Sequence, residues 1–306
     1  MKILVTGGAG FIGSHIVDRL LEKRFEVIVI DNLSTGNKKN INPKSTVYNA
    51  DITDLRSLEK VFEKEKPDYV VHAAANIKVR ESVKNPIHDA NVNIIGGLNI
   101  FECCKNFHIK KIIYLSSGGA IYGDPKYLPV DEEHTIDPIS PYGISKRALE
   151  LYLNSCHEAH NLNFVGLRLS NVYGPRDSEE SDHIIPVLIH NILNDKTPII
   201  SGDGSQARDF IYVDDVADAV LMGLEKNPKE KFFNIGTEKA TSINELFNEI
   251  KSLLKSSISA KYKEENKSEV KKICLSIRKA KKELGWVPKT SLSQGMKETI
   301  KWFKEK

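Results

Sequence analysis

The sequence predicts an α/β protein with a doubly wound parallel sheet and a smaller C-terminal lobe. In the first half of the chain, short apolar runs alternate with longer stretches whose apolar residues recur at helical spacing. Continuous apolar strands separated by helices are typical of a parallel sheet that helices cover on both faces. After Gly174 the alternation becomes less regular. A smaller lobe that caps the sheet is therefore expected there.

The expected strands are runs of β-branched and other apolar residues. In the first half they are Lys2–Thr6, Glu26–Ile30, Thr46–Ala50, Asp68–Ala73, Lys111–Ser117 and Asn163–Leu169. The stretches with helical spacing between them are Phe11–Lys23, Leu55–Glu65, Val83–Asn106 and Pro141–His160. Further strands are expected within Thr197–Val213 and Lys231–Gly236, and a helix is expected to begin at Asp214 and Asp215.

The composition argues against several classes of protein. The chain has 306 residues, of which 40% are hydrophobic and 28% charged, and its formal net charge is +3. This charge is too small to indicate nucleic acid or an anionic membrane as the main partner. No run approaches the ~20 apolar residues of a membrane span. The apolar run at the start is too short for a signal peptide.

The cysteines predict neither a metal site nor a disulfide framework. Cys103, Cys104, Cys156 and Cys274 contain no Cys-x-x-Cys pair. We therefore expect no metal, and interpret the thiols as small buried side chains in a reducing compartment. A cytoplasmic location follows as an expectation.

A glycine-rich stretch, VTGGAGFIGSH (Val5–His15), joins the first expected strand to the first expected helix. Gly8, Gly10 and Gly13 fit the spacing G-x-G-x-x-G, while Gly7, Gly10 and Gly13 fit G-x-x-G-x-x-G. Glycine lets the backbone turn tightly and approach a pyrophosphate at the helix N-terminus. A glycine run alone is a weak signal, but its place between a strand and a helix predicts a Rossmann-type dinucleotide site.

Asp31 indicates which dinucleotide binds. It follows the second expected strand, in VIDNLSTG. A carboxylate at this place accepts hydrogen bonds from a ribose 2′-hydroxyl and repels a 2′-phosphate, which predicts NAD and not NADP. The alternative interpretation is that Asp31 only forms the turn before Asn32.

A Tyr-x-x-x-Lys pair, Tyr142 and Lys146, lies in SPYGISKRALELYL (Ser140–Leu153). Residues four apart project from the same side of a helix. An ammonium beside a phenol favours the phenolate, so Tyr142 is predicted to act as a general base near neutral pH. The spacing alone occurs often by chance on helix surfaces. Downstream of a complete dinucleotide motif it is much more specific.

With these motifs the sequence resembles the extended short-chain dehydrogenase/reductase superfamily and, within it, the UDP-glucose 4-epimerase family of nucleotide-sugar enzymes. The resemblance covers nearly the whole chain. It rests on TGGAGFIGSH, DNLSTG, ADITD (Ala50–Asp54), HAAA (His72–Ala75), SSGGAIYG, SPYGISK, LRLSNVYGPR (Leu167–Arg176), GDGSQARDFIYVDD (Gly202–Asp215) and FNIGT (Phe233–Thr237).

The resemblance implies an NAD-dependent isomerase with three groups of site residues. The implied cofactor-binding residues are Gly7, Gly10, Phe11, Ile12, Gly13, Asp31, Asn32, Ser34, Thr35, Gly36, Asp51, Ile52, Ala73, Ala74, Ala75, Asn93, Ser116, Tyr142 and Lys146. The implied substrate-binding residues are Gly118, Tyr142, Asn171, Ile184, Ile185 and Arg208. The catalytic candidates are Tyr142, Lys146, Ser117 and Ser116. Considered alone, Arg208 could form an exposed ion pair with Asp209, and Asn171 could cap the turn before Gly174.

The resemblance also implies an organisation of the chain. Residues 1–172 are expected to bind NAD, with 206–236 returning to that part, and 173–205 and 237–306 are expected to bind the nucleotide sugar, a UDP-hexose. A homodimer is expected through the helices around Val92–Lys105 and Pro141–His160, packed as a bundle. Burial of these helices against the sheet would fit their apolar residues equally well.

The chain departs from the family at several positions. The family usually has Ser or Thr where this chain has Gly118. A water, or the hydroxyl of Ser117 or Ser116, is expected to fill the space, so Gly118→Ser should raise the rate with little effect on stability. The alternative is that this position requires glycine because its backbone has a positive φ angle. Ser201, Asn266 and Ser276 replace an aromatic residue, an arginine and an aspartate that the family commonly has there.

The reaction expected from the resemblance is epimerisation at C4. Related dehydratases carry Thr-Asp-Glu where this chain has Gly118, Gly119 and Ala120, and related decarboxylases keep that glutamate. Ala120 cannot transfer a proton, so we expect a transient 4-keto intermediate in the interconversion of UDP-glucose and UDP-galactose, a reaction of galactose metabolism, or of their N-acetyl forms. The alternatives are a nucleotide-sugar ketoreductase or dehydrogenase and, less favoured, a non-catalytic NAD-sensing module.

Overall fold

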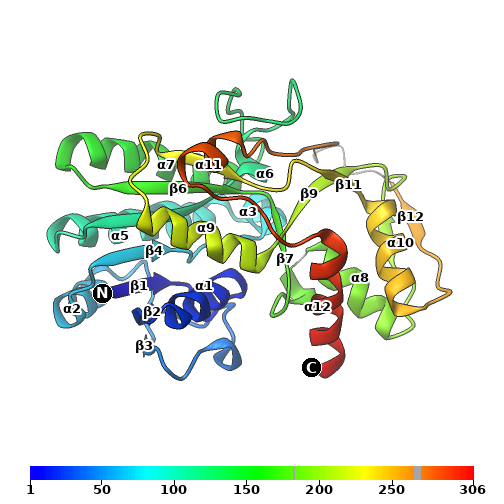
Figure 1. The fold of residues 1–306 in the computed structure, drawn as a ribbon, viewed down its shortest axis with the longest axis horizontal. Helices are drawn as coiled ribbons and strands as arrows, with labels where there is room; N and C mark the ends of the chain where they lie inside the picture. The colour runs from blue at the N-terminus through cyan, green and yellow to red at the C-terminus, as the bar shows by residue number, and fades with distance from the viewer. Residues whose placement is uncertain (182, 265–269) are drawn as a thin grey trace.

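The computed structural model describes residues 1–181, 183–264 and 270–306. Its centre is a seven-stranded parallel sheet with the strand order β10-β6-β5-β4-β1-β2-β3 (Figure 1). The strands are β1 (Lys2–Thr6), β2 (Glu26–Ile30), β3 (Thr46–Tyr48), β4 (Tyr69–His72), β5 (Lys111–Ser117), β6 (Phe164–Leu169) and β10 (Phe232–Ile235). The strand order reverses between β1 and β4, and ligands of open α/β sheets bind outside the carboxyl ends of the strands at such a point.

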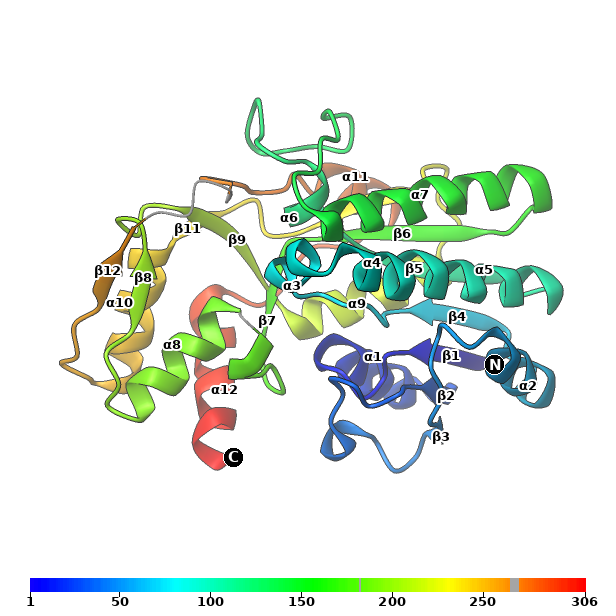
Figure 2. The same cartoon turned by 180° about the vertical axis from the view of Figure 1, so that it is seen from behind.

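Helices cover both faces of this sheet. One face carries α1 (Phe11–Glu22), α9 (Val213–Glu225) and α11 (Arg278–Glu283), in front in Figure 1. The other carries α2 (Leu55–Glu65), α5 (Gly96–Asn106) and α7 (Pro141–His160), with α5 and α7 in front in Figure 2. Successive side chains of a strand point to opposite faces, so Ile3 and Val5 join the first core and Leu4 joins the second.

The single helix expected at Val83–Asn106 is wrong, because the chain forms four shorter helical segments there. They are α3 (Val79–Lys84), α4 (Pro86–Ala90), the π-helical η2 (Asn91–Ile95) and α5. Proline lacks an N–H and is tolerated in the first turn of a helix, so Pro86 ends one helix and begins the next. The Asn85 side chain caps the new helix by accepting from the His88 N–H at 3.1 Å.

The smaller lobe contains two short sheets and three helices among the described residues. One sheet has the order β11 (Ala240–Ser242), β9 (Ala207–Tyr212), β7 (Asn171–Tyr173), and the other pairs β12 (Lys261–Lys263) with β8 (Ile199–Ser201). The helices are α8 (Ile184–Leu193), α10 (Ile243–Leu254) and α12 (Leu292–Glu305). They share a separate apolar core. The remaining short helices are η1 (Lys38–Asn40), α6 (Gly118–Ile121) and η3 (Glu179–Ser181).

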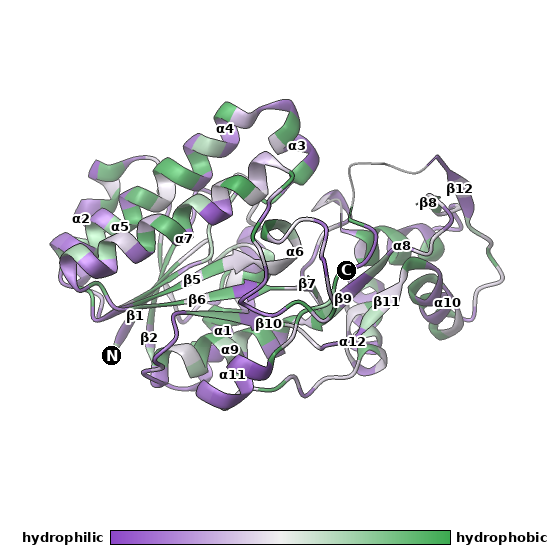
Figure 3. Ribbon diagram, turned by 90° about the horizontal axis from the view of Figure 1, so that it is seen from above, coloured by the Kyte–Doolittle hydropathy of each residue, from purple (hydrophilic) through white to green (hydrophobic). Residues whose placement is uncertain are grey.

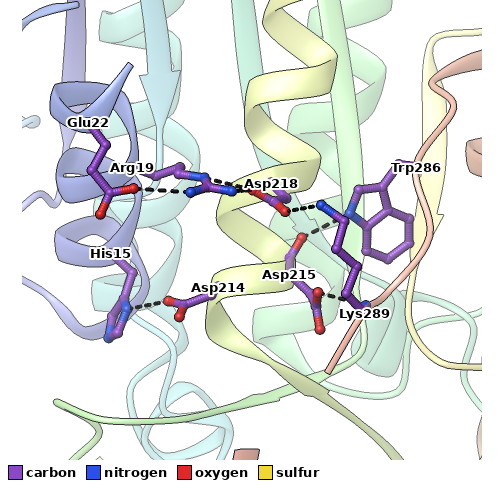
Figure 4. A network of polar contacts seen from close by, with 8 residues as sticks. All are labelled: His15, Arg19, Glu22, Asp214, Asp215, Asp218, Trp286 and Lys289. Carbon is purple, nitrogen blue, oxygen red and sulfur yellow. Dashed lines mark hydrogen bonds and ion pairs between the residues drawn. The ribbon is translucent and has the colours of Figure 1, made fainter. Parts of the chain in front are cut away.

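Charged side chains fasten α1 to α9 and both to the segment that leads into α12 (Figure 4). The Asp218 carboxylate accepts from the Arg19 Nε at 2.7 Å and from the Lys289 Nζ at 2.8 Å. One turn earlier, His15 Nδ1 lies 2.9 Å from Asp214 Oδ1. Through Asp218 on α9, the segment that leads into the smaller lobe is thus linked to the helix that follows the glycine-rich stretch. No helix in residues 1–181, 183–264 or 270–306 is both long and apolar enough to span a membrane.

Candidate functional site

The glycine-rich stretch forms a tight turn between β1 and α1. Gly7 has a φ of +72°, and its N–H donates to the Ile30 carbonyl at 2.8 Å. A Cβ on Gly13 would lie 2.1 Å from the Gly7 carbonyl oxygen, and one on Gly7 would lie 2.8 Å from the Ala74 backbone. Only glycine allows this approach. Gly10 precedes α1 without a side-chain cap, so the N–H groups of the first turn, at Phe11 and Ile12, face the carboxyl edge of the sheet.

Asp31 joins two loops at this edge. Its Oδ2 accepts from the Ala9 N–H at 2.9 Å, and its Oδ1 accepts from the Leu33 N–H at 2.8 Å. The second bond is the turn-forming contact that was the alternative interpretation, and it coexists with the contact to the glycine-rich stretch. A Cβ on Gly36 would lie 2.8 Å from Asp31 Oδ1. The segment Ser34–Gly36 therefore packs against this carboxylate.

Asn32 and Asp51 meet on the same side of the sheet. The Asn32 Nδ2 donates to Asp51 Oδ2 at 2.7 Å, while the Thr53 N–H and hydroxyl donate to Asp51 Oδ1 at 2.8 and 2.7 Å. Burial favours a higher pKa for Asp51, but the bonds from Thr53 and Asn32 outweigh it and lower the pKa. Ile52 is buried, with its carbonyl accepting from Asn99 Nδ2 at 2.9 Å. The structure therefore brings the cofactor-binding candidates Asn32 and Asp51 together, next to the buried Ile52.

The end of β4 is organised by the Thr6 hydroxyl. It accepts from the N–H groups of Ala73 and Ala74 at 3.2 and 3.1 Å, and it lies 2.8 Å from His72 Nδ1. With its lone pairs used by two donors, the hydroxyl gives its proton to Nδ1, which leaves the His72 proton on Nε2. Burial, with a contribution from Lys146, lowers the pKa of His72 to about 3. The imidazole is thus neutral and fixes the backbone that leads into Ala75.

Tyr142 and Lys146 lie on the first turns of α7, beneath the carboxyl end of β5. Pro141 occupies the first turn, and Ser140 caps the helix by accepting from the Gly143 N–H at 3.2 Å. The Lys146 Nζ donates to the Leu115 carbonyl at 2.8 Å and lies 5.9 Å from the centre of the Tyr142 ring. Both side chains are buried. The pair is therefore buried at the carboxyl end of β5, the edge of the parallel sheet at which the glycine-rich stretch also lies.

The protein groups alone do not bring the pKa of Tyr142 toward neutrality. Burial raises the pKa of Tyr142 to about 12; a side-chain hydrogen bond with Ser117 lowers it and the charge of Asp89 raises it. Burial also lowers the pKa of Lys146 to about 8, against the raising effect of Asp89 and Glu150. Desolvation of the phenolate is the largest of these effects on the pKa of Tyr142.

The two serines of the β5 end have different partners. The Ser116 hydroxyl is buried and donates to Glu150 Oε1 at 2.7 Å. The Ser117 side chain interacts with the Tyr142 phenol and lowers its pKa, against the larger raising effect of burial. Of the two catalytic candidates, only Ser117 is in contact with the phenol.

Both interpretations of Gly118 are wrong. Gly118 is the buried first residue of α6 and does not have a positive φ angle. It does not leave space either, because a Cβ there would lie 2.6 Å from Leu275 Cδ1 and 3.3 Å from the Arg168 carbonyl oxygen. The Leu275 side chain, buried at 1% exposure, occupies the volume of the missing side chain.

The candidate substrate residues lie where the smaller lobe meets the sheet. Asn171, the first residue of β7, is exposed, and its Oδ1 would be 3.7 Å from a Cβ on Gly119. Arg208 donates from Nη1 to the carbonyls of Ala207 and Lys271 at 3.0 and 3.3 Å. Its neighbour Asp209 is buried and accepts from Thr237 and Leu275. The two therefore do not form the exposed ion pair that was the alternative interpretation.

The other substrate-side positions are less open. Ile184 begins α8, and the Ile185 side chain is buried in the core of the smaller lobe, so only its backbone can contact a ligand. Ser201 ends β8, and its carbonyl accepts from Gln206. The Ser276 hydroxyl is buried and donates to Glu238 at 3.2 Å. Asn266 lies outside the described residues.

A polar cluster adjoins the Tyr142–Lys146 pair through Ser145. Of its residues, only Asn93 was predicted from the sequence. Asn93, predicted as a cofactor residue, donates from Nδ2 to the Asn76 carbonyl and to Asp89 Oδ1, both at 2.9 Å, and accepts from the Asn76 N–H at 2.8 Å. The Ser145 hydroxyl donates to Asp89 Oδ2 at 2.7 Å. Asp89 and Asn93 stand four apart, a spacing that brings two side chains together on a helix and could have revealed the pair.

Comparisons with known proteins agree with this geometry. Residues 3–236 match the model of the NAD dependent epimerase/dehydratase family. A protein of Methanocaldococcus jannaschii named putative UDP-glucose 4-epimerase is 49% identical over 303 residues, which cover 99% of this chain and 98% of that protein.

Two solved structures are also similar over the whole chain. The UDP-glucose 4-epimerase of Thermotoga maritima, solved with UDP-glucose, is 43% identical with a TM-score of 0.97, covering 100% of this chain and 99% of that one. The UDP-N-acetylglucosamine 4-epimerase of Methanobrevibacter ruminantium M1, solved with UDP-N-acetylmuramic acid, is 39% identical with a TM-score of 0.93, covering 99% and 98%.

Proposed function

The chain belongs to the UDP-glucose 4-epimerase family, within the NAD dependent epimerase/dehydratase family, and from this we propose that it is an isomerase that inverts C4 of a nucleotide sugar with NAD. One observation carries the proposal: Tyr142 and Lys146 are buried together at the carboxyl end of β5, at the same edge of the parallel sheet as the glycine-rich turn. A phenol placed there can exchange a proton with a sugar hydroxyl, while Ala120 offers no group for elimination chemistry.

The residues at the carboxyl edge fit NAD. The uncapped first turn of α1 and the close backbone contacts of Gly7 and Gly13 provide the approach that a pyrophosphate requires. The Asp31 carboxylate stands at the ribose position and repels a 2′-phosphate. When bound, NAD supplies the hydride acceptor and a positive charge near Tyr142, which favours the phenolate.

The roles of the catalytic side chains follow from their contacts. Tyr142 takes the proton of the sugar 4-hydroxyl and returns it when the other epimer forms. Lys146 supplies a positive charge and is held by the Leu115 carbonyl. We assign to Ser117 the role expected of the hydroxyl that is missing at Gly118, because its side chain interacts with Tyr142 whereas the hydroxyl of Ser116 is bound to Glu150.

The substrate is a UDP-hexose, either UDP-glucose and UDP-galactose or their N-acetyl forms. The similarity to a UDP-glucose 4-epimerase and to a UDP-N-acetylglucosamine 4-epimerase supports both. Asn171 is a candidate ligand for the diphosphate, since its exposed amide makes no hydrogen bond within residues 1–181, 183–264 and 270–306. Arg208 and the backbone at the start of α8, Ile184 and Ile185, are the further candidates.

Different parts of the chain bind the cofactor and the nucleotide sugar under this proposal. Residues 1–172 and 206–236 hold the cofactor, while 173–205 and 237–306 hold the nucleotide sugar; β7 and β9 lie at this boundary and pair in the sheet of the smaller lobe. The pairing of β10 with β6 in the main sheet supports the return of the chain to the first part. A cytoplasmic location agrees with the four free cysteines.

A homodimer is the proposed assembly. The outer surfaces of α3, α4, η2 and α7, which lie together at one side of the molecule in Figure 3, expose large apolar side chains. These are Val79, Val83, Ile87, Ile95, Ile144, Leu151 and Tyr152. Contiguous exposed apolar side chains mark association surfaces, and a second copy that brings the same helices forms a helical bundle.

The test of the proposed function uses purified protein and UDP-galactose in deuterated water with no added nicotinamide. We expect UDP-glucose without deuterium at C4, because the hydride removed from C4 returns to it. Tyr142→Phe should keep bound NAD but lose about 10²–10⁴-fold in turnover, the contribution of a positioned general base.

Other outcomes would contradict the proposal. Deuterium at C4 excludes direct return of the hydride. Oxidation of UDP-galactose to a keto sugar, with stoichiometric reduction of added NAD, would favour the alternative of a ketoreductase or dehydrogenase. Near wild-type turnover of Tyr142→Phe would remove Tyr142 from the mechanism.

A further inference from the structure

Asp89 is a fully buried carboxylate behind the Tyr-Lys pair. It lies on α4, at 0% exposure, and each oxygen accepts one hydrogen bond: Oδ2 from the Ser145 hydroxyl at 2.7 Å and Oδ1 from Asn93 Nδ2 at 2.9 Å. A buried carboxylate is costly unless hydrogen bonds and a nearby positive charge compensate it. The two donors meet the first condition. The source of the positive charge indicates what Asp89 does.

Lys146 is the positive charge that faces Asp89 from a neighbouring element. Each affects the other: Lys146 lowers the pKa of Asp89, against the larger raising effect of burial, and Asp89 raises that of Lys146. The other charged and titratable groups around the two are His88 on α4, the rings of His72, Tyr114 and Tyr142, and Glu150 on α7. Within the described part of the chain, no side chain forms an ion pair with either Asp89 or Lys146 at contact distance.

Glu150, the second carboxylate near Lys146, is already compensated by arginines. Arg168 donates to its two oxygens at 3.0 and 2.9 Å, and Arg147 donates to it at 2.9 Å. Its charge is therefore largely cancelled close by, whereas that of Asp89 is not. Asp89 is left as the main negative charge that offsets the buried Lys146 ammonium.

The hydrogen bonds of Asp89 also connect three segments of the site. Ser145 directly precedes Lys146 on α7. Asn93 lies in the π-helical turn η2, and its amide makes two hydrogen bonds with the backbone of Asn76, in the loop that follows β4. That loop continues the segment Ala73–Ala75, which packs against the glycine-rich turn. In Figure 2, α4 lies beside α3, α5 and α7 at this end of the sheet.

We propose that Asp89 is a positioning residue for the Tyr142–Lys146 pair: its carboxylate anchors α7 next to Lys146 and provides the counter-charge that keeps Lys146 an ammonium. The proposal rests on the proposed function, because it assigns the pair its role in proton transfer. It also explains why a carboxylate is retained where burial is complete. A neutral side chain would avoid the cost of desolvation but would leave the Lys146 charge without compensation.

Removal of the Asp89 charge changes the pKa of both members of the pair in the same direction. Asp89 raises the pKa of Lys146 and also that of Tyr142, so Asp89→Asn lowers both. Turnover requires an ionised Tyr142 and a charged Lys146. Because the pKa values of both groups fall, both limbs of the pH profile of kcat should move to lower pH.

The experiment compares three variants with the wild type. Asp89→Asn should move both limbs to lower pH and reduce kcat at the optimum by about 10–100-fold, the effect of a small misplacement of reacting groups. Ser145→Ala removes a hydrogen bond but keeps the charge, so it should reduce kcat without moving the limbs. Asp89→Glu keeps the charge at a different position and should behave like Ser145→Ala. Unchanged limbs and kcat in Asp89→Asn, or shifted limbs in Ser145→Ala, would overturn the proposal.

A spectroscopic titration separates this proposal from the proposed function. The absorbance of the Tyr142 phenolate, taken as the difference between a protein and the same protein with Tyr142→Phe, should appear at lower pH in Asp89→Asn than in the wild type. This readout needs no turnover, so it stands even if the wild type lacks epimerase activity. A phenolate titration that Asp89→Asn leaves unchanged contradicts the counter-charge role. If Asp89→Asn does not fold, a Ser145→Ala variant with wild-type kcat contradicts the anchoring role.

Discussion

Gly118 and Leu275 share one small volume at the carboxyl end of β5, although they are far apart in the sequence. A Cβ on Gly118 would overlap Leu275 Cδ1 at 2.6 Å, and Leu275 is itself buried. The hydroxyl that related chains place here is therefore excluded by a neighbour and not simply missing. Ser117, which contacts Tyr142, is the hydroxyl that remains.

We predict that Gly118→Ser destabilises the protein and slows it. The added side chain forces Leu275 to move, and overpacking of this kind costs about 1–3 kcal/mol in the free energy of unfolding. Denaturant unfolding and kcat measure the two effects. Gly119→Ser is the control for stability, because the nearest atom to its Cβ is Asn171 Oδ1 at 3.7 Å, an ordinary contact. The double variant Gly118→Ser with Leu275→Ala should recover part of the loss in stability and kcat. A Gly118→Ser variant that is as stable as the wild type and faster would show that Leu275 does not exclude a side chain there.

At the residue scale, the sequence alone predicted those site residues whose type or spacing meets one clear physical requirement. Gly7 and Gly13 were predicted because only glycine allows their backbone contacts, and Tyr142 with Lys146 because their spacing places them on one side of a helix. The alternation of a strand placed Ser116 beside Gly118, but its hydroxyl bonds to Glu150. Leu275 could not be predicted, since nothing local indicates a contact between distant segments.

The Lys111 side chain holds the end of α9 against β5. From the sequence, Lys111 was predicted only to begin a strand. It is the first residue of β5, at 3% exposure, and its Nζ donates to the carbonyls of Gly223, Leu224 and Lys226 at 3.2, 2.9 and 2.6 Å. These carbonyls end α9, where the helix dipole favours a positive charge. Lys111 therefore fixes α9 against the edge of β5.

We predict that Lys111→Met lowers the free energy of unfolding by about 2 kcal/mol, because methionine fills the space but leaves buried carbonyls without a donor. Lys110→Met is the control one residue away. Lys110 is 61% exposed and pairs with Asp68 at the surface, so its loss should cost less than about 1 kcal/mol. Urea unfolding compares the two variants. Equal effects would mean that Lys111 does not act as a cap.

At the scale of elements, apolar periodicity located most of the main sheet. The bounds of β1, β2, β5, α2 and α7 agree with the prediction, since each begins or ends at a clear change in residue pattern. The prediction failed at Pro86, where a proline inside the helical pattern begins a new helix capped by Asn85. It also missed the three-residue β7, because so short a strand carries no periodicity.

For the whole molecule, the exposed apolar surface of α3, α4, η2 and α7 predicts dimerisation. Ile87 is 82% exposed and Leu151 52% exposed. Replacing both by lysine should shift the protein from dimer to monomer, because charges buried in an interface without partners weaken it strongly. Light scattering after gel filtration gives the mass. The control is Ile199→Lys, at a site on β8 that is 59% exposed but lies in the other lobe. A wild type that is monomeric at all concentrations tested would disprove the dimer.

The overall division into a sheet and a smaller lobe was predicted from the loss of regular alternation after Gly174. The arrangement within the lobe was not, because its strands are three to six residues long and pair across large sequence separations. Its attachment through Lys289, Asp218 and Arg19 depends on charges that look like ordinary surface residues in the sequence.

The helix α4 has only five residues, with Ile87 exposed on one side and Asp89 buried on the other. A helix this short does not persist alone, so its shape depends on what contacts it from both sides. Under the two proposals, the surface that recognises the second copy and the carboxylate behind the Tyr-Lys pair are parts of one rigid unit. A small molecule that wedges between the copies at α4 would then act as a non-competitive inhibitor, lowering turnover without occupying the nucleotide-sugar pocket.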